Sequence, residues 1–143
     1  MPRDYKIKSV LICDDVRQEI SGKEILIGVY NDVIVFTDIP TIIPKLAFRI
    51  AVSSEKTLGT FKFRLEDPSR DKIIEIEGQV GNPQDPKLDP YRTIGIVCAG
   101  LPFSVVGTYR ILLGIDRKPE LIWDFVVRGP RTDEEKRRLQ APF

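Results

Sequence analysis

Histidine is absent from this chain of 143 residues. Its absence removes the commonest general base near neutral pH and the commonest nitrogen ligand for zinc, copper and iron. Serine-histidine and cysteine-histidine catalysis are therefore excluded. The sequence also lacks a nucleophile motif and a phosphate-binding glycine loop, so we expect a protein that is not an enzyme and that holds no cofactor and no metal.

Cysteine is scarce, and long apolar runs are missing. The two cysteines, Cys13 and Cys98, each lie in an apolar segment, which is typical of buried free thiols. A disulfide between two strands is the alternative, although nothing indicates an oxidising compartment. The first residues alternate charged and apolar side chains, unlike a secretory leader, and a stretch of about 18 apolar residues does not occur. We expect a cytoplasmic protein, or part of a phage-like particle assembled there, without a membrane partner.

The charge is balanced, with 22 Lys and Arg against 21 Asp and Glu and a formal net charge of +1. A protein that coats duplex DNA needs massed Lys and Arg to neutralise phosphates. We therefore expect no nucleic-acid partner. The length and the hydrophobic content of 42% suit one domain with a sizeable core.

Two-residue alternation is the strongest pattern present. Phe61, Phe63 and Leu65 alternate with charged residues, as in a strand that covers a core with one face. Other apolar runs are bounded by turn residues in the same way. Ile25-Leu26-Ile27 is apolar at successive positions, as in a central strand that is covered on both faces. The predicted strands are Ile7 to Cys13, Glu24 to Tyr30, Val33 to Phe36, Lys45 to Ser53, Gly59 to Asp67, Lys72 to Val80, Arg92 to Cys98, Ser104 to Ile115 and Leu121 to Arg128.

Eight or nine short strands without a long helix predict an all-β, antiparallel sandwich or barrel. Of these, we expect an immunoglobulin-like antiparallel β-sandwich. Asp67 to Asp71 and Asp116 to Pro119 have the composition of hairpin connections. The last hairpin is expected to place eight residues in the core: Tyr109, Ile111, Leu113, Ile115, Leu121, Trp123, Phe125 and Val127. By analogy with immunoglobulin-like domains, the Tyr109 hydroxyl is expected to bond back to nearby backbone.

Three segments fall outside the regular pattern. Thr37 to Pro44 holds two prolines, so we expect it to cross between sheets and not to pair as an interior strand. Gly81 to Pro90 reads as a stiffened exposed loop. Thr132 and Glu135 fit a capping box that begins a short helix, Asp133 to Leu139. We therefore divide the chain into a β-sandwich domain, residues 1–130, and a C-terminal tail, residues 131–143.

Polar residues are densest near the N-terminus, between the first two predicted strands. The simpler interpretation is an ion-paired, charged connection with a turn at Gly22. The functional interpretation is an anchor for a ligand or partner, formed by Asp14, Asp15, Arg17, Glu19 and Lys23.

The same region carries a resemblance. The runs Leu11 to Glu19, Gly22-Lys23 and Ile27 to Tyr30, with Gly107-Thr108-Tyr109 and Val126-Val127-Arg128, resemble a family of small bacterial and phage-associated proteins that is a domain of unknown function. The resemblance implies an immunoglobulin-like β-sandwich and no established activity, cofactor or catalytic residue.

Carboxylates raise two further hypotheses. Calcium binding by sandwich loops would draw on Asp14, Asp15, Asp32 and Asp38, but their spacing is not that of an EF-hand. A carboxylate pair for sugar hydrolysis could come from Glu75 and Glu77, although alternating Glu residues more simply form a solvated face that discourages edge pairing.

We therefore expect a non-catalytic protein-interaction or assembly module that binds another protein or copies of itself, most simply by β-augmentation at a sheet edge. The alternatives are a structural subunit of a phage-like particle, and a small-ligand or carbohydrate binder that uses Tyr30, Tyr91 or Phe103. Docking of the C-terminal tail through Leu139 and Phe143 is a further alternative to a solvated terminus. Besides the five charged residues above, the candidate interaction residues are Tyr30, Tyr91 and Phe143.

Overall fold

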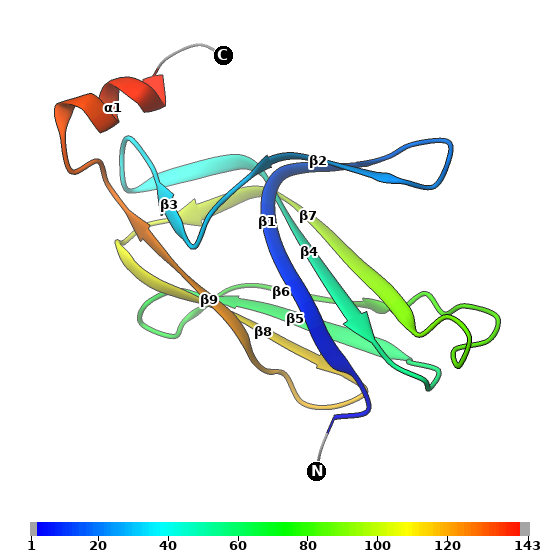
Figure 1. Cartoon of the computed structure of the whole chain (residues 1–143). Helices are drawn as coiled ribbons and strands as arrows, with labels where there is room; N and C mark the ends of the chain where they lie inside the picture. Colours follow the sequence, from blue (N-terminus) through cyan, green and yellow to red (C-terminus); the bar gives the residue numbers. More distant parts are fainter. Residues whose placement is uncertain (1–2, 141–143) are drawn as a thin grey trace.

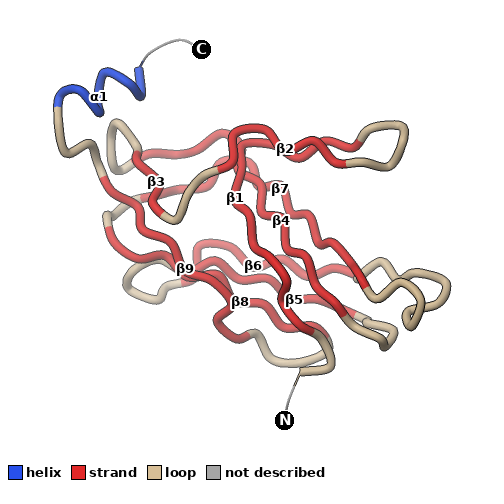
Figure 2. Tube along the Cα trace, in the orientation of Figure 1, coloured by secondary structure: helices blue, strands red, loops and turns tan. Residues whose placement is uncertain are grey.

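The computed structural model describes residues 3–140 and places nine strands in two sheets, followed by one helix (Figures 1 and 2). All nine predicted strands are present. One sheet has the order β2-β1-β4-β7, and the other has the order β3-β9-β8-β5-β6. The elements are β1 (Lys6–Gln18), β2 (Glu24–Val29), β3 (Val33–Val35), β4 (Thr41–Ser53), β5 (Thr60–Glu66), β6 (Lys72–Gln79), β7 (Tyr91–Phe103), β8 (Gly107–Ile115), β9 (Glu120–Arg128) and α1 (Asp133–Gln140).

The two sheets pack face to face around one apolar core. Alternate residues of β4, β5, β7 and β8 point between the sheets, and the rings of Phe48 on β4 and Phe63 on β5 meet at a centroid distance of 5.0 Å. Every strand pair is antiparallel except β3 with β9. The expected hairpins β5-β6 and β8-β9 are both formed. The prediction of an all-β, immunoglobulin-like sandwich is confirmed.

A chain of aromatic rings fills one end of the core. Phe103 lies 5.1 Å from Tyr109, which lies 5.7 Å from Phe125, measured between ring centroids. The Tyr109 hydroxyl donates a hydrogen bond of 2.7 Å to the carbonyl oxygen of Val105. The expected bond from this tyrosine back to the nearby backbone is therefore confirmed, and it fixes the turn that joins the two sheets between β7 and β8.

Two predictions about local packing are wrong. Leu121 and Trp123 were expected in the core, but 46% and 37% of their surfaces are exposed. They lie on β9, which is flanked on its outer side by the three residues of β3, and β3 pairs only from Val126 onward. Trp123 therefore has little to cover it. Leu121 is exposed for another reason: the register shift between β8 and β9 pairs it with Leu112, and Ile122 packs against the core in its place. Likewise, Ile25 and Ile27 were expected under cover on both faces, yet both are exposed because they pair with β1 beyond Cys13, where β1 has left β4 and the sandwich.

The second proline of Thr37 to Pro44 lies within a strand, contrary to expectation. Residues 41–44 belong to β4, and Ile43 and Lys45 pair with β7 on either side of Pro44. On the other side of β4, the pairing with β1 ends at Cys13 opposite Ala47. Pro44 lies beyond that stretch, where its missing N–H breaks no ladder bond to β1.

Arg92 fixes the beginning of β7. Its side chain is buried, and its guanidinium donates hydrogen bonds to the carbonyl oxygens of Ser54, Lys56 and Pro90 at 2.7, 2.8 and 2.5 Å. These carbonyls belong to two of the connections that cross between the sheets, β4-β5 and β6-β7. The guanidinium group of Arg92 is therefore buried and hydrogen-bonded inside the protein, and it adds no charge to the outer surface of β7.

The C-terminal tail begins as predicted. The backbone N–H of Glu135 donates to Thr132 Oγ1 at 3.0 Å, which confirms the capping bond, and α1 covers the expected residues and one more. The Glu135 carboxylate also accepts a bond of 3.0 Å from Arg128, which lowers the pKa of Glu135 to about 2. This ion pair attaches α1 to the end of β9.

Both cysteines are buried free thiols, which confirms the simpler expectation, and burial raises the pKa of each. Among residues 3–140, α1 is the one helix, and it is too short and too polar to cross a membrane.

The Tyr109 hydroxyl provides a test of the packing. Tyr109→Phe removes the bond to the Val105 carbonyl and is expected to lower the free energy of unfolding by about 1 kcal/mol. Urea denaturation followed by tryptophan fluorescence measures the change. Tyr91→Phe is the matched control, because the Tyr91 side chain is exposed, and it should leave the midpoint unchanged. Equal midpoints for the two variants would contradict the role assigned to Tyr109.

Candidate functional site

The first two strands extend beyond the sandwich as a two-stranded arm, which we define as residues 14–28. β1 pairs with β4 only as far as Cys13, but it continues to pair with β2 as far as Gln18 opposite Glu24. Figure 1 shows the arm bending away from the core and running above β4 and β7. The polar residues singled out in the sequence are therefore the arm itself.

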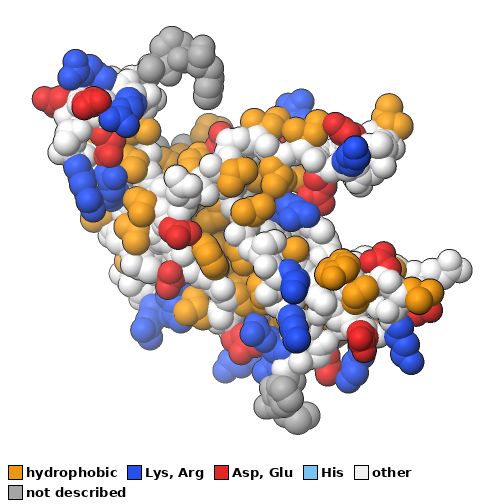
Figure 3. Space-filling model, in the orientation of Figure 1, with side chains coloured by type: hydrophobic (Ala, Val, Ile, Leu, Met, Phe, Trp, Pro, Cys, Tyr) orange, Lys and Arg blue, Asp and Glu red, His pale blue; other side chains and the backbone are white. Residues whose placement is uncertain are grey.

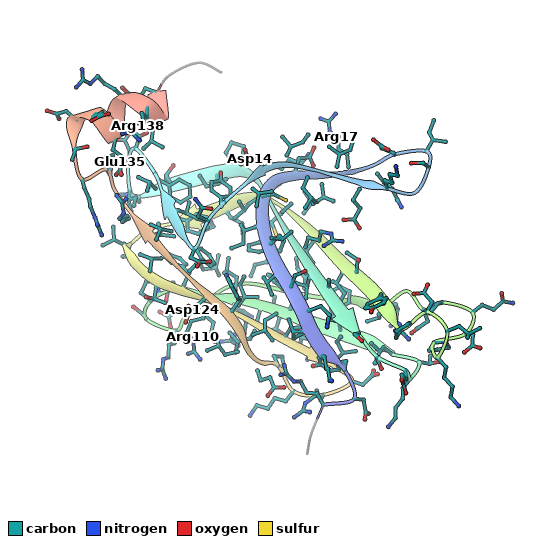
Figure 4. All side chains as sticks on the ribbon, viewed as in Figure 1. Asp14, Arg17, Arg110, Asp124, Glu135 and Arg138 are labelled. Carbon is teal, nitrogen blue, oxygen red and sulfur yellow. The ribbon has the colours of Figure 1, made fainter. Side chains whose placement is uncertain are left out.

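A hydrogen-bonded unit holds the base of the arm. Tyr30 donates a bond of 2.6 Å from its hydroxyl to Asp14 Oδ1, and burial, followed by the Asp14 carboxylate, raises the pKa of Tyr30. Gly28 lies against the same carboxylate with φ +65°, and a Cβ at this position would come within 2.8 Å of Asp14 Cγ. Only glycine fits a left-handed backbone this close to another side chain. Figure 4 shows Asp14 at the bend.

Ion pairs brace the arm against the outer face of β4. Lys45 Nζ lies 2.7 Å from Asp15 Oδ1, Arg17 Nε lies 2.9 Å from Asp15 Oδ2, and Arg49 pairs with Glu24. The hydrogen bonds from Lys45 and then Arg17 lower the pKa of Asp15 to about 2. Asp15 therefore stays ionised at neutral pH and joins the arm to the sheet.

The interpretation of this region as a loop is wrong for Asp14, Asp15 and Arg17, which lie within β1. The connection is limited to Glu19–Lys23, where the Glu19 N–H donates to the Lys23 carbonyl at 2.7 Å and the Gly22 N–H donates to the Glu19 carbonyl at 2.9 Å. A two-stranded ribbon outside the sandwich has no core to cover, so its strands do not need the apolar alternation that identifies a strand in sequence.

A groove separates the arm from the outer face of β4 and β7. Its volume is about 460 Å³, and the residues that line it are Val16, Arg17, Gln18, Glu24, Arg49, Thr93, Gly95 and Val97. The space-filling view shows the arm overhanging a hollow on this side of the molecule (Figure 3). The floor is formed by Thr93, Gly95 and Val97, which are small or β-branched and uncharged.

The free edge of β7 borders this groove. β7 is the last strand of its sheet and pairs with β4 from Tyr91 to Phe103. Its exposed residues up to Gly100 are Tyr91, Thr93, Gly95, Val97 and Ala99. None of these residues is charged, and none is a proline. Charged residues and prolines are the usual means by which an edge strand is protected from pairing.

The other candidate residues are dispersed. Tyr30 points into the base of the arm, Phe103 is fully buried, and Tyr91 is exposed at the beginning of β7. Phe143 lies outside the described residues, and Leu139 is exposed on α1. Within residues 3–140, Asp14 and Asp15 do not come together with Asp32, Asp38 or other acidic residues in a cluster that could hold a metal ion.

Sequence reasoning missed the floor of the groove. Thr93, Gly95 and Val97 alternate with buried residues of β7, so the strand itself was found, but its position at a sheet edge depends on pairing over long sequence distances. One signal was available: every exposed position of this strand up to residue 100 is uncharged, in contrast to Glu75 and Glu77 on β6.

Gly28→Ala tests the base of the arm. The new methyl group requires a left-handed alanine and displaces Asp14 from Tyr30, so we expect a loss of roughly 2 kcal/mol or more in the free energy of unfolding. Gly22→Ala is the matched control, because Gly22 also has a positive φ of 90° but a Cβ there meets no atom within 4 Å. It should cost about 1 kcal/mol. Equal losses in urea denaturation would contradict the contact.

A second test concerns the pH dependence of the brace. Because the pKa of Asp15 is about 2, against an ordinary value of 3.8, its stabilisation is complete above pH 4 and is lost as the pH falls through 2. Lys45→Met should raise the pKa of Asp15 towards its ordinary value in an NMR titration of the carboxyl carbon. Lys56→Met is the control, since Lys56 pairs with Asp4. An Asp15 titration that Lys45→Met leaves unchanged would contradict the brace.

Comparison with known proteins gives a family but no activity. A search of curated proteins finds no match. An immunoglobulin-like protein of known structure from Pseudomonas aeruginosa is 12% identical, and the match covers 88% of this chain and 98% of that chain with a TM-score of 0.39. The family model that matches spans residues 8–128, so the resemblance to a domain of unknown function is confirmed, while the phage association stays a prediction. The chain belongs to the family of unknown function DUF6941.

Proposed function

We propose that this protein is a non-catalytic interaction module that binds a protein strand at the free edge of β7, beneath the arm. The observation that carries the proposal is the combination of a long uncharged edge with an overhanging groove. Unpaired N–H and C=O groups on an edge strand supply affinity for another extended backbone, and neighbouring side chains supply specificity. The partner strand would extend the sheet β2-β1-β4-β7 by one position.

The contrast among the four sheet edges supports β7. β3 has three residues, and β2 is part of the arm. β6 carries Lys72, Glu75 and Glu77, and charged side chains on an edge oppose the approach of another strand. β7 pairs without interruption with β4 from Tyr91 to Ala99, and Gly100 then adopts a φ of +69°. It is the edge best suited to pairing.

The arm adds apolar contacts to the backbone pairing that the free edge of β7 offers. Val97 and Tyr91 expose 52% and 66% of their surfaces along β7, while Ile20 at the tip of the arm is fully exposed. A strand added to β7 would be covered on its outer side by the arm, and its side chains would contact these apolar groups. Apolar contact in a confined groove adds affinity that backbone pairing alone lacks.

The charged residues of the arm fit a structural role in this module. Asp14 holds the bend through Tyr30, and Asp15 and Glu24 hold the arm at a fixed height above β4. These pairs support an assignment of the cluster to positioning and not to acid-base chemistry. Of the three aromatic residues considered for carbohydrate binding, Tyr91 alone is exposed, and its place on the edge of β7 suits a protein strand equally well.

Photo-crosslinking tests the proposal in the cells that produce the protein. p-Benzoylphenylalanine in place of Tyr91 is an aromatic of similar shape at the free edge, and we expect it to form a covalent adduct with a protein strand on irradiation. Mass spectrometry of the adduct identifies the bound peptide.

The matched control carries the same amino acid in place of Glu77, on the edge of β6. It should give little or no adduct, because that edge is protected by charge. No adduct at position 91, or equal adducts at positions 91 and 77, would overturn the proposed function.

A further inference from the structure

We infer that the strand bound at β7 is the β7 of a second copy of this chain, paired antiparallel about a two-fold axis, with each arm lying over the partner's β7. This inference rests on the proposed function and names its partner. Pairing of the two edges joins two four-stranded sheets into one continuous sheet of eight strands.

The charges of β7 favour pairing with itself. Arg92 is the one charged residue in β7, and it is buried and bonded to three backbone carbonyls. An antiparallel register centred on Gly95 places Thr93 opposite Val97 and Tyr91 opposite Ala99, so the exposed side chains meet without like charges. The same operation on β6 places Glu75 opposite Glu77 of the other copy, which is repulsive. The edges therefore differ in their compatibility with a second copy.

The arm extends beyond the free edge of β7, over the space where a paired strand would lie. Gln18 and Glu24 are the last paired residues of the arm, and they line the groove together with Thr93, Gly95 and Val97 of β7. The turn at Glu19–Lys23 continues past them, so the tip overhangs the space next to β7 (Figures 1 and 3). Ile20 in this turn is fully exposed. In the two-fold dimer it lies over the outer face of the partner's β7.

The area of contact favours a copy over a foreign strand. A stable dimer buries roughly 1,200 to 2,000 Å² in total, and one pair of short strands supplies only part of this. A foreign peptide meets one arm. A second copy meets one arm and contributes another, so every contact between an arm and β7 occurs twice. The exposed apolar residue at the tip of the arm, Ile20, then belongs to an interface and not to a solvated hairpin.

Light scattering after size-exclusion chromatography tests the inference with purified protein over a range of concentrations. We expect the mass of two chains. Val97→Lys places a charge beneath the partner's arm, and Ile20→Asp places one on the tip, where the side chain is fully exposed and its replacement does not disturb the fold. Each should weaken the dimer about tenfold or more.

Matched controls carry the same changes away from the interface. Val106→Lys and Val106→Asp alter an exposed apolar residue in the β7-β8 connection. Both should remain dimeric. Hydrogen exchange adds a direct measurement, since amides of residues 93–99 should gain protection as the concentration rises, in wild type and not in Val97→Lys.

The outcomes separate the two proposals. A single-chain mass at the highest soluble concentration overturns the dimer. If Tyr91 substituted with the photo-crosslinker then captures a different protein, the proposed function stands with that protein as the partner. A monomer without any adduct overturns both. A dimer that Val97→Lys and Ile20→Asp leave intact has its interface elsewhere, which also overturns the inference.

Discussion

The bend of β1 after Cys13 determines the shape of the surface beside β4 and β7. Up to that residue β1 is an interior strand that pairs with β4, and beyond it the strand pairs with β2 alone. The bend is maintained by the contact of Asp14 with Tyr30 and Gly28, and its height above the sheet is maintained by the ion pair of Asp15 with Lys45. The groove, its uncharged floor and the overhang all depend on these contacts.

The two outer faces of the sandwich differ in a way that agrees with this arrangement. On the sheet that contains β5, β6 and β8, ion pairs join Arg64 to Glu66 and Glu75, and Arg110 to Glu66. That face carries a network of paired charges. The face beside β7 has small uncharged side chains beneath the arm. The two outer faces therefore differ in charge.

Much of the fold was predictable, because alternation such as that of Phe61 to Leu65 reports directly on a covered sheet face, and because Thr132 and Glu135 form a local capping pattern. The site was less predictable. Asp14 to Gln18 form a strand without apolar alternation, and Pro44 lies in β4 only because β1 departs before reaching it. Trp123 is exposed because β3 is short. Each of these depends on which strands are neighbours, and a single sequence does not state that.

The two thiols give this architecture native reporters. Cys98 belongs to the edge strand β7 and faces the core, and Cys13 lies on β1 at the foot of the arm; both are shielded from solvent, and neither forms a disulfide. A soluble aromatic disulfide reagent reaches Cys98 only when β7 separates from its sheet, and it reaches Cys13 only when the arm lifts. The two labelling rates therefore measure the opening of the strand and of the arm independently, without any engineered probe.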